Sequence, residues 1–228
     1  MTSPGARRNA SRNVVKLPRD LAIFSPLTSS MPLWAIAQAN IKRMLAYSTI
    51  AQMGYLLIGL IVASQNVVMA VLFHSLAYAC MTIGAFGMVV LLQRGAGQGE
   101  QIDDFSGLAQ RSPLAAGVML LFLLSLTGIP PTAGFVAKVY IFSGAIHTGQ
   151  SWLVALVAVA VVNTAISAFY YLRWVRTMFI DDPLDATPIA TPGGTQAVLL
   201  LAGAGVLLFG LVPTPLLSAA QRAAEALL

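Results

Sequence analysis

The sequence has few charged residues and almost no cysteine or histidine. Only 9% of its 228 residues are Asp, Glu, Lys or Arg, against about 25% in an ordinary soluble domain, which argues against a soluble enzyme. The single cysteine, Cys80, excludes an internal disulfide and every multi-cysteine metal or redox centre. Two histidines argue against any other metal centre.

The charges that are present have a basic excess, with a net charge of +5. They are gathered in short stretches that separate long uncharged runs. Basic residues that flank apolar runs follow the positive-inside bias of membrane proteins. We therefore expect contact with a lipid bilayer and no nucleic-acid partner.

Apolar residues make up 57% of the chain, and a membrane-spanning helix needs about 20 of them in a row. Residues 21–39 give only a partial span, because Pro26 and Pro32 interrupt them. The sequence thus predicts an all-α, polytopic transmembrane helix bundle with about five full spans plus the partial one. The full spans are Met44–Ser64, Val67–Gln93, Pro113–Thr148, Ser151–Arg176 and Gln196–Leu211.

The third of these runs is too long for one straight span, and the string GIPPTAG at 128–134 interrupts it. Pro130 and Pro131 lack amide donors, so a continuous helix cannot pass through them without losing backbone hydrogen bonds. The run is either two short spans with a tight turn, or one span with a break around Gly128–Thr132.

The distribution of basic residues favours the single broken span. In that topology eleven basic residues lie on one side of the membrane, and the other side has only Arg222. We therefore expect the 94–112 loop in the cytoplasm and the C-terminus outside. The eleven are Arg7, Arg8, Arg12, Lys16, Arg19, Lys42, Arg43, Arg94, Arg111, Arg173 and Arg176.

The first 30 residues differ from the rest of the chain. They are basic, have little apolar content and contain no apolar core of a secretory signal. We interpret 1–30 as a disordered or unrelated segment, and 31–228 as the membrane domain. A mitochondrial-type targeting stretch and a truncated coding region explain this beginning equally well.

Lys138 is the one Lys or Arg residue deep within a predicted span, and all eight acidic residues lie in tails or loops. If a helix resumes near Thr132, Lys138 lies about 9 Å beyond the break, near the middle of the membrane. Broken helices at that depth line water-filled cavities or are buried in protein. We predict a proton-relaying lysine beside a hydrated break. The alternative is a structural lysine paired with a carboxylate of a partner chain.

His74 is the second candidate relay. It stands seven residues into the second span, and Ser75, Tyr78 and Thr82 follow it closely enough to form a polar stripe. A neutral histidine that only hydrogen-bonds a neighbouring helix explains the position equally well.

Five strings carry a family resemblance. They are NIKRMLAYSTIAQMGYLL (40–57), FHSLAYACMTIGAFG (73–87), DDFSGLAQRSPL (103–114), LLSLTGIPPTAGFVAKVYIF (123–142) and NTAISAFYYLRWVRTMF (163–179). Over roughly Leu33–Leu217 the chain resembles subunit N of bacterial proton-pumping NADH:quinone oxidoreductase, complex I. The wider class of antiporter-like subunits includes Mrp-type cation/proton antiporter and membrane hydrogenase subunits, and the FYYLR string favours subunit N.

The resemblance implies a fold of two inverted five-helix repeats, each with a broken helix that holds a lysine. Lys138 matches the lysine of the second broken helix, on the proton exit route, whereas the role of His74 cannot be carried over. NADH, FMN, iron-sulfur clusters and quinone are expected in other subunits, with no cofactor in this chain. Other membrane subunits of complex I are the expected partners, and the cell (inner) membrane the expected location.

More than the first half of the family fold is missing from the sequence. The principal hypothesis is a complex I subunit that takes part in proton translocation. The alternatives are a Na⁺/H⁺ antiporter (Mrp-type) subunit, a membrane hydrogenase subunit, or a non-conducting truncated fragment.

Overall fold

The computed structural model describes residues 35–96, 99–184, 189 and 192–227, and these are helical with no strand. An all-α fold is therefore confirmed for the described part of the chain. The predicted 1–30 segment and most of the partial span lie outside the described residues. The elements are α2 (Ile41–Val62), α3 (Gln65–Ala96), the 3₁₀ turn η2 (Ile102–Phe105), α4 (Leu108–Arg111), α5 (Pro113–Thr127), α6 (Ala133–His147), α7 (Ser151–Phe179), α8 (Gly193–Leu211) and α9 (Thr214–Leu227).

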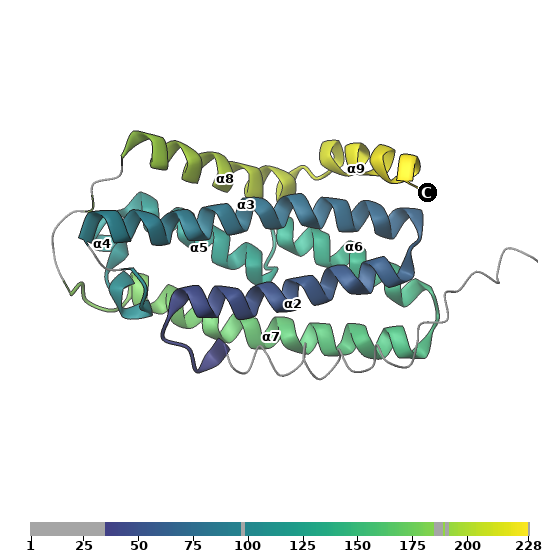
Figure 1. The fold of residues 1–228 in the computed structure, drawn as a ribbon, viewed down its shortest axis with the longest axis horizontal. Coiled ribbons are helices and arrows are strands. Elements are labelled where there is room, and N and C mark those ends of the chain that lie inside the picture. The colour runs from purple at the N-terminus through teal and green to yellow at the C-terminus, as the bar shows by residue number, and fades with distance from the viewer. Residues whose placement is uncertain (1–34, 97–98, 185–188, 190–191, 228) are drawn as a thin grey trace, which may run out of the picture.

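The predicted spans are present. Helices α2, α3, α7 and α8 are each long and apolar enough to cross a membrane. Helices α5 and α6 have 15 residues each, which is about 22 Å of helix and too short to span alone. Helix α5 starts beside α4 and α6 ends at the opposite end of the bundle, near the start of α7 (Figure 1). The two helices together make one crossing with a break between them, as predicted. With α2, α3, α7 and α8 this completes the five full spans.

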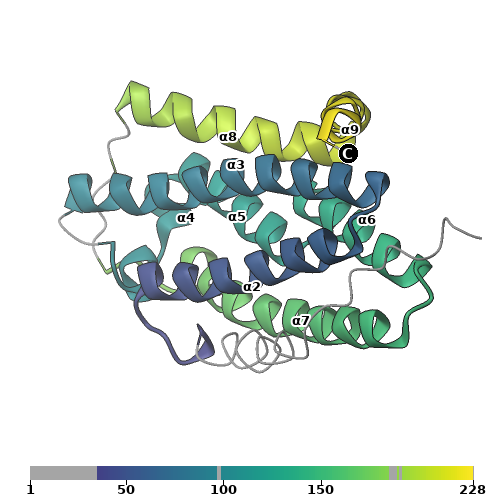
Figure 2. The same ribbon diagram turned by 45° about the vertical axis from the view of Figure 1, so that its right-hand side comes forward.

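Helix α3 lies at the centre of the bundle and contacts α2, α5, α6, α8 and α9. Helix α8 runs along one side of α3, while α2 and then α7 lie on the other side (Figures 1 and 2). Helix α9 turns away from the direction of α8 and crosses the end of the bundle (Figure 2). This arrangement packs both α5 and α6 against α3 and α8.

The distribution of polar residues is the reverse of that in a soluble protein. Lys138, Gln52 and His74 are buried, while Leu201 and Phe169 are 73% and 62% exposed. Large contiguous apolar surfaces mark contact with a membrane or another protein. The outer faces of this bundle are therefore suited to lipid and to neighbouring membrane subunits, and polar chemistry is confined to its interior.

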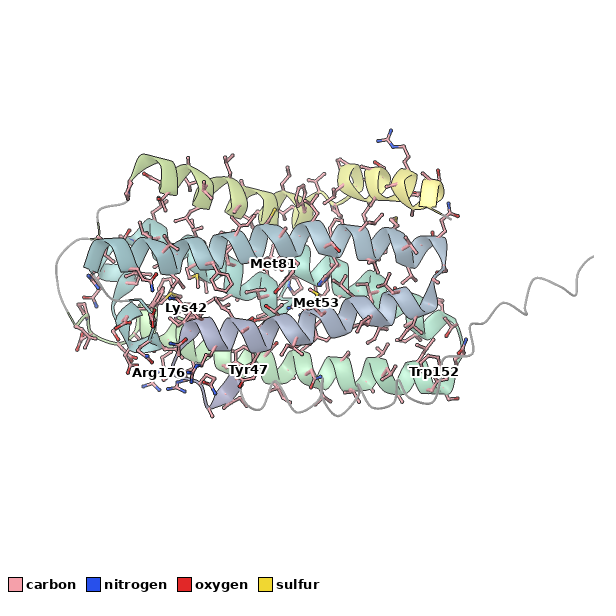
Figure 3. The ribbon with its side chains drawn as sticks, viewed as in Figure 1. Lys42, Tyr47, Met53, Met81, Trp152 and Arg176 are labelled. Carbon is pink, nitrogen blue, oxygen red and sulfur yellow. The ribbon has the colours of Figure 1, made fainter. Side chains whose placement is uncertain are left out.

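Charged side chains mark the ends of the bundle. Lys42 and Arg176 lie at the end that holds η2 and α4, whereas Trp152 lies at the opposite end (Figure 3). We call the first of these the α4 end. Lys42 forms an ion pair with Glu100 at 2.6 Å. The side-chain oxygen of Asp104 accepts hydrogen bonds from the backbone N–H groups of 99, 100 and 101, which orders the loop after α3.

Candidate functional site

The site is built on the junction between α5 and α6. Helix α5 ends at Thr127 and is capped by Gly128, which adopts φ 89° and donates its N–H to the carbonyls of Leu124 (2.9 Å) and Ser125 (3.0 Å). This left-handed conformation favours glycine. The last carbonyls of a helix lack intrahelical partners, so those of Leu126 and Thr127 are available to side chains.

The prolines prevent the helix from continuing through the junction. Pro130 and Pro131 contribute no backbone N–H, and the chain turns instead through Thr132, whose hydroxyl donates to the Ile129 carbonyl at 2.7 Å. Helix α8 packs closely over this segment, because a Cβ at Gly210 would collide with the Pro131 carbonyl and Thr132. The predicted break at Gly128, Pro130 and Pro131 is therefore present. Thr132 is buried under α8, whereas the two prolines are exposed.

The Lys138 side chain extends back from α6 to the C-terminal end of α5, where carbonyls lack intrahelical partners. Its Nζ donates to the carbonyls of Leu126 (3.0 Å) and Thr127 (2.9 Å), since helical side chains point toward the N-terminus of their own helix. The Nζ also lies 5.1 Å from the ring centroid of Tyr55, within the range of a cation–π interaction. Only 5% of Lys138 is exposed. Among the described residues, it forms no ion pair with a carboxylate.

Gly128 leaves room for this lysine. A Cβ at Gly128 would lie 3.0 Å from Lys138 Cδ and 3.2 Å from Nζ. The glycine therefore meets two requirements at once, the positive φ and the passage of the lysine side chain. On α6, a Cβ at Gly134 would collide with the Ser125 carbonyl, so the two helices approach backbone to backbone.

Gln52 belongs to the site, although it was not among the residues predicted from the sequence. Its Nε2 donates to the Leu126 carbonyl at 3.0 Å, so Gln52 and Lys138 share one acceptor. Its Oε1 is buried without a hydrogen-bond partner among the described residues. A signal was present, because Ser48 and Gln52 are polar residues four positions apart in an apolar span, the spacing of one helix face.

Hydroxyl groups continue the polar interior from the break toward the α4 end. The Tyr78 hydroxyl donates to Thr49 Oγ1 at 2.7 Å, and Thr49 donates to the Leu45 carbonyl at 3.0 Å. The hydroxyls of Ser48 and Tyr171 are also hydrogen-bonded to each other. Hydroxyls both donate and accept, so this set can relay protons as well as bind water.

His74 is fully buried in α3, and neither ring nitrogen has a hydrogen-bond partner among the described residues. Its ring is stacked on that of Tyr78, with centroids 6.2 Å apart. The predicted polar stripe is only partly formed. Tyr78 and Thr82 face the interior, but Ser75 is exposed and donates to the Val71 carbonyl. The role of His74 stays a prediction.

Comparisons with known proteins give the relationship of this chain. The family described as "NADH:quinone oxidoreductase/Mrp antiporter, TM" matches residues 20–166. NADH-quinone oxidoreductase subunit N of Thiobacillus denitrificans is 46% identical over 190 residues, which are 83% of this chain and 38% of that protein.

Two solved structures share the fold. A chain of respiratory complex I from Thermus thermophilus with bound aureothin aligns with TM-score 0.70 and 29% identity, over 89% of this chain and 45% of the other. A chain of the membrane-bound sulfane sulfur reductase, an archaeal respiratory membrane complex, aligns with TM-score 0.79 and 30% identity. The alignment covers 90% of this chain and 41% of the other.

The chain spans less than half the length of the curated relatives it matches. Those relatives are subunit N proteins, so the resemblance noted in the sequence is confirmed. The apolar helices and the transmembrane family match place the chain as a multi-pass protein of the cell (inner) membrane. The chain belongs to the NADH:quinone oxidoreductase/Mrp antiporter transmembrane family.

Proposed function

We propose that this chain is part of the membrane arm of a respiratory NADH:quinone oxidoreductase, where it takes part in proton translocation. The observation that carries the proposal is Lys138, a buried amine at a helix break whose only hydrogen-bond acceptors, within the described part of the chain, are two backbone carbonyls. The names of the relatives, NADH-quinone oxidoreductase subunit N, support the assignment to this enzyme complex.

The geometry suits a group that gains and loses a proton. An ammonium has three N–H donors and a neutral amine has two, so the bonds to Leu126 and Thr127 can persist in either state. No carboxylate among the described residues holds the charged form. Burial disfavours an isolated charge, while the carbonyl dipoles and the Tyr55 ring favour it. These opposed effects make both protonation states accessible to Lys138.

His74 is proposed as a second group on the route. Its ring is stacked on that of Tyr78, and its ring nitrogens are free of protein partners among the described residues. A neutral imidazole can accept a proton at one nitrogen and release one from the other. His74 therefore adds a buried proton-binding group next to Tyr78.

Electron transfer is assigned to other subunits. We propose that NADH, FMN, iron-sulfur clusters and quinone bind elsewhere in the complex, and that this chain holds no cofactor. Its proposed partners are the other membrane subunits of complex I. The wide apolar outer faces and the exposed prolines of the break both suit a chain that works inside a larger assembly, because an interrupted helix at membrane depth needs protein around it.

The second candidate function is cation/proton antiport, because the matched family includes Mrp antiporters by its own description. In that case Lys138 serves cation exchange and no electron transfer is involved. Two further candidates are a membrane hydrogenase subunit and a non-conducting fragment, which only packs against neighbouring subunits.

An affinity tag on the full chain in its native membranes separates these functions. If the proposal is correct, mild detergent extraction recovers the tagged chain together with NADH:quinone oxidoreductase activity, and deletion of its gene lowers NADH-driven proton uptake by inverted vesicles. Na⁺-driven proton movement without NADH supports the antiporter instead. A deletion that leaves both activities intact identifies a non-conducting chain and overturns the proposal.

A further inference from the structure

A small cavity lies between α2, α3 and the end of α5. Four of its seven lining residues carry hydroxyls, and the cavity has about 10 Å³ of room for the centre of a water molecule, close to the least volume that holds one water. The lining residues are Leu45, Ser48, Thr49, Tyr78, Thr82, Phe86 and Leu126.

One of the lining hydroxyls has no protein partner. Thr82 Oγ1 is buried without a hydrogen bond among the described residues, and an unpaired buried hydroxyl is unfavourable. Buried waters typically pair such groups and make about three hydrogen bonds each. Tyr78 and Thr49, already bonded to each other, supply further oxygens within the same cavity lining.

The cavity adjoins the Lys138 site. Leu126 belongs to both, because it lines the cavity and its carbonyl accepts from Lys138 Nζ. Met53 and Met81, the sequence neighbours of Gln52 and Thr82, lie midway along the bundle (Figure 3). From this level, the hydrogen bonds from Tyr78 to Thr49 and from Thr49 to the Leu45 carbonyl follow α2 toward its first turn, at the α4 end.

We propose that this cavity holds one ordered water and that, with Thr82, Tyr78 and Thr49, it gives Lys138 a proton route from the α4 end of the bundle. This inference rests on the proposed function. In the direction of pumping, a hydronium ion at the α4 end passes a proton to the Thr49 oxygen, and each hydroxyl releases its original proton to the next oxygen. The ordered water receives a proton in the same way and passes one of its own to the neutral Nζ of Lys138. Each oxygen of the route gains one proton and loses one, so only the amine changes charge, and the Leu45 carbonyl only accepts a hydrogen bond.

Thr82→Val and Thr82→Ser form the matched pair for the test. Valine keeps the shape of threonine but removes the hydroxyl, whereas serine keeps the hydroxyl. In inverted vesicles that contain the assembled complex, Thr82→Val should lower the rate of NADH-driven proton uptake per assembled complex by about tenfold, which is the effect of one lost buried hydrogen bond on a transfer step. Thr82→Ser should retain most of the uptake.

Ser75→Ala is the control, because its hydroxyl lies on the same helix but is exposed and bonded to Val71. This variant should pump normally. The thermal stability of the complex gives a second, independent readout. If water fills the cavity, Thr82→Val leaves that water short of a partner and lowers the unfolding temperature. If the cavity is dry, the same change removes an unpaired buried hydroxyl and raises it.

Two results overturn this inference while leaving the proposed function intact. One is normal pumping with Thr82→Val in membranes where Lys138→Ala blocks pumping. The other is a raised unfolding temperature for Thr82→Val. Normal pumping with Lys138→Ala overturns the proposed function itself, so the two failures are distinguishable.

Discussion

Lys138 and Gln52 donate hydrogen bonds to the same oxygen, the backbone carbonyl of Leu126, each at 3.0 Å. Two bonds that meet at one atom keep the two side-chain nitrogens no more than about 6 Å apart. The shared acceptor has a consequence for the lysine. If the amine moves to deliver a proton, the carbonyl remains paired through Gln52, so the movement leaves no buried oxygen without a donor.

We predict that Gln52→Met slows proton uptake without preventing assembly. Methionine has a similar volume but no donor, so the Leu126 carbonyl then depends on Lys138 alone. Movement of the amine leaves a buried acceptor unpaired, at a cost of about 1 to 3 kcal/mol, and about 1.4 kcal/mol corresponds to a tenfold slower step. NADH-driven proton uptake per assembled complex measures the effect.

Gln221→Met is the control, because Gln221 is exposed on α9. This variant should pump normally, and equal rates of proton uptake for the two variants would exclude this role of Gln52.

Gly128→Ala should impair both stability and pumping. An alanine at φ 89° is strained by about 1 to 2 kcal/mol, and its Cβ crowds the Lys138 side chain. Gly149→Ala is the matched control. It has a φ of 70° but nothing within 4 Å of the added Cβ, so it carries strain alone. If both variants lose similar stability but only Gly128→Ala loses pumping, the pumping defect lies at the Lys138 side chain. Equal pumping by the two variants would refute this role of Gly128.

Much of this architecture follows from the sequence because lipid imposes strict requirements. Long uncharged runs predict the spans, since a helix that crosses a membrane needs about 20 apolar residues. Pro130 and Pro131 predict the break, because two missing donors cannot be tolerated in a continuous helix. Lys138 is identified because a charged group inside a span is costly and therefore rare.

The acceptors of Lys138 could not be predicted in the same way. They are backbone carbonyls, which every residue has, and their availability depends on how α5 ends. Gln52 and Ser48 are neutral and are tolerated within spans, so they produce little signal. Ser75 and Thr82 lie on nearly the same face of α3, so their different exposure depends on which neighbouring helices cover each level of α3, which charge and hydropathy do not fix.

Gly134→Ala should destabilise the helix junction. The added Cβ collides with the Ser125 carbonyl, and because this atom is backbone, α5 and α6 must move apart. Overpacking of this kind costs about 1 to 3 kcal/mol. Gly117→Ala, an exposed position on α5 with nothing near the added Cβ, should be neutral or more stable by up to about 1 kcal/mol. Thermal unfolding of the assembled complex measures both variants, and a stable Gly134→Ala would mean that the two helices are not in close contact.

The single crossing of α5 and α6 predicts opposite exposure of their outer ends. In a Cys80→Ala background, Ser112→Cys should react with a membrane-impermeant thiol reagent from the cytoplasmic side and Gln150→Cys from the other side. The prediction follows from the position of the break midway along the bundle and the basic residues at the α4 end (Figure 3). Labelling of both residues from the same side would contradict it.

Substitution of Lys138 separates a proton relay from a structural role. In Lys138→Ala the carbonyl of Thr127 loses its side-chain donor and no charge is introduced, so assembly should persist while NADH-driven proton uptake is strongly reduced. Lys138→Arg should also fail to pump, because a guanidinium with a pKa above about 12 keeps its proton. If Lys138 is instead the ion-pair partner of a carboxylate in another subunit, the results reverse. Arginine then largely restores function, and alanine lowers assembly by leaving that carboxylate buried and unpaired. Native gels and proton uptake on the same membranes distinguish the two cases, and normal pumping with alanine at this position would exclude the relay.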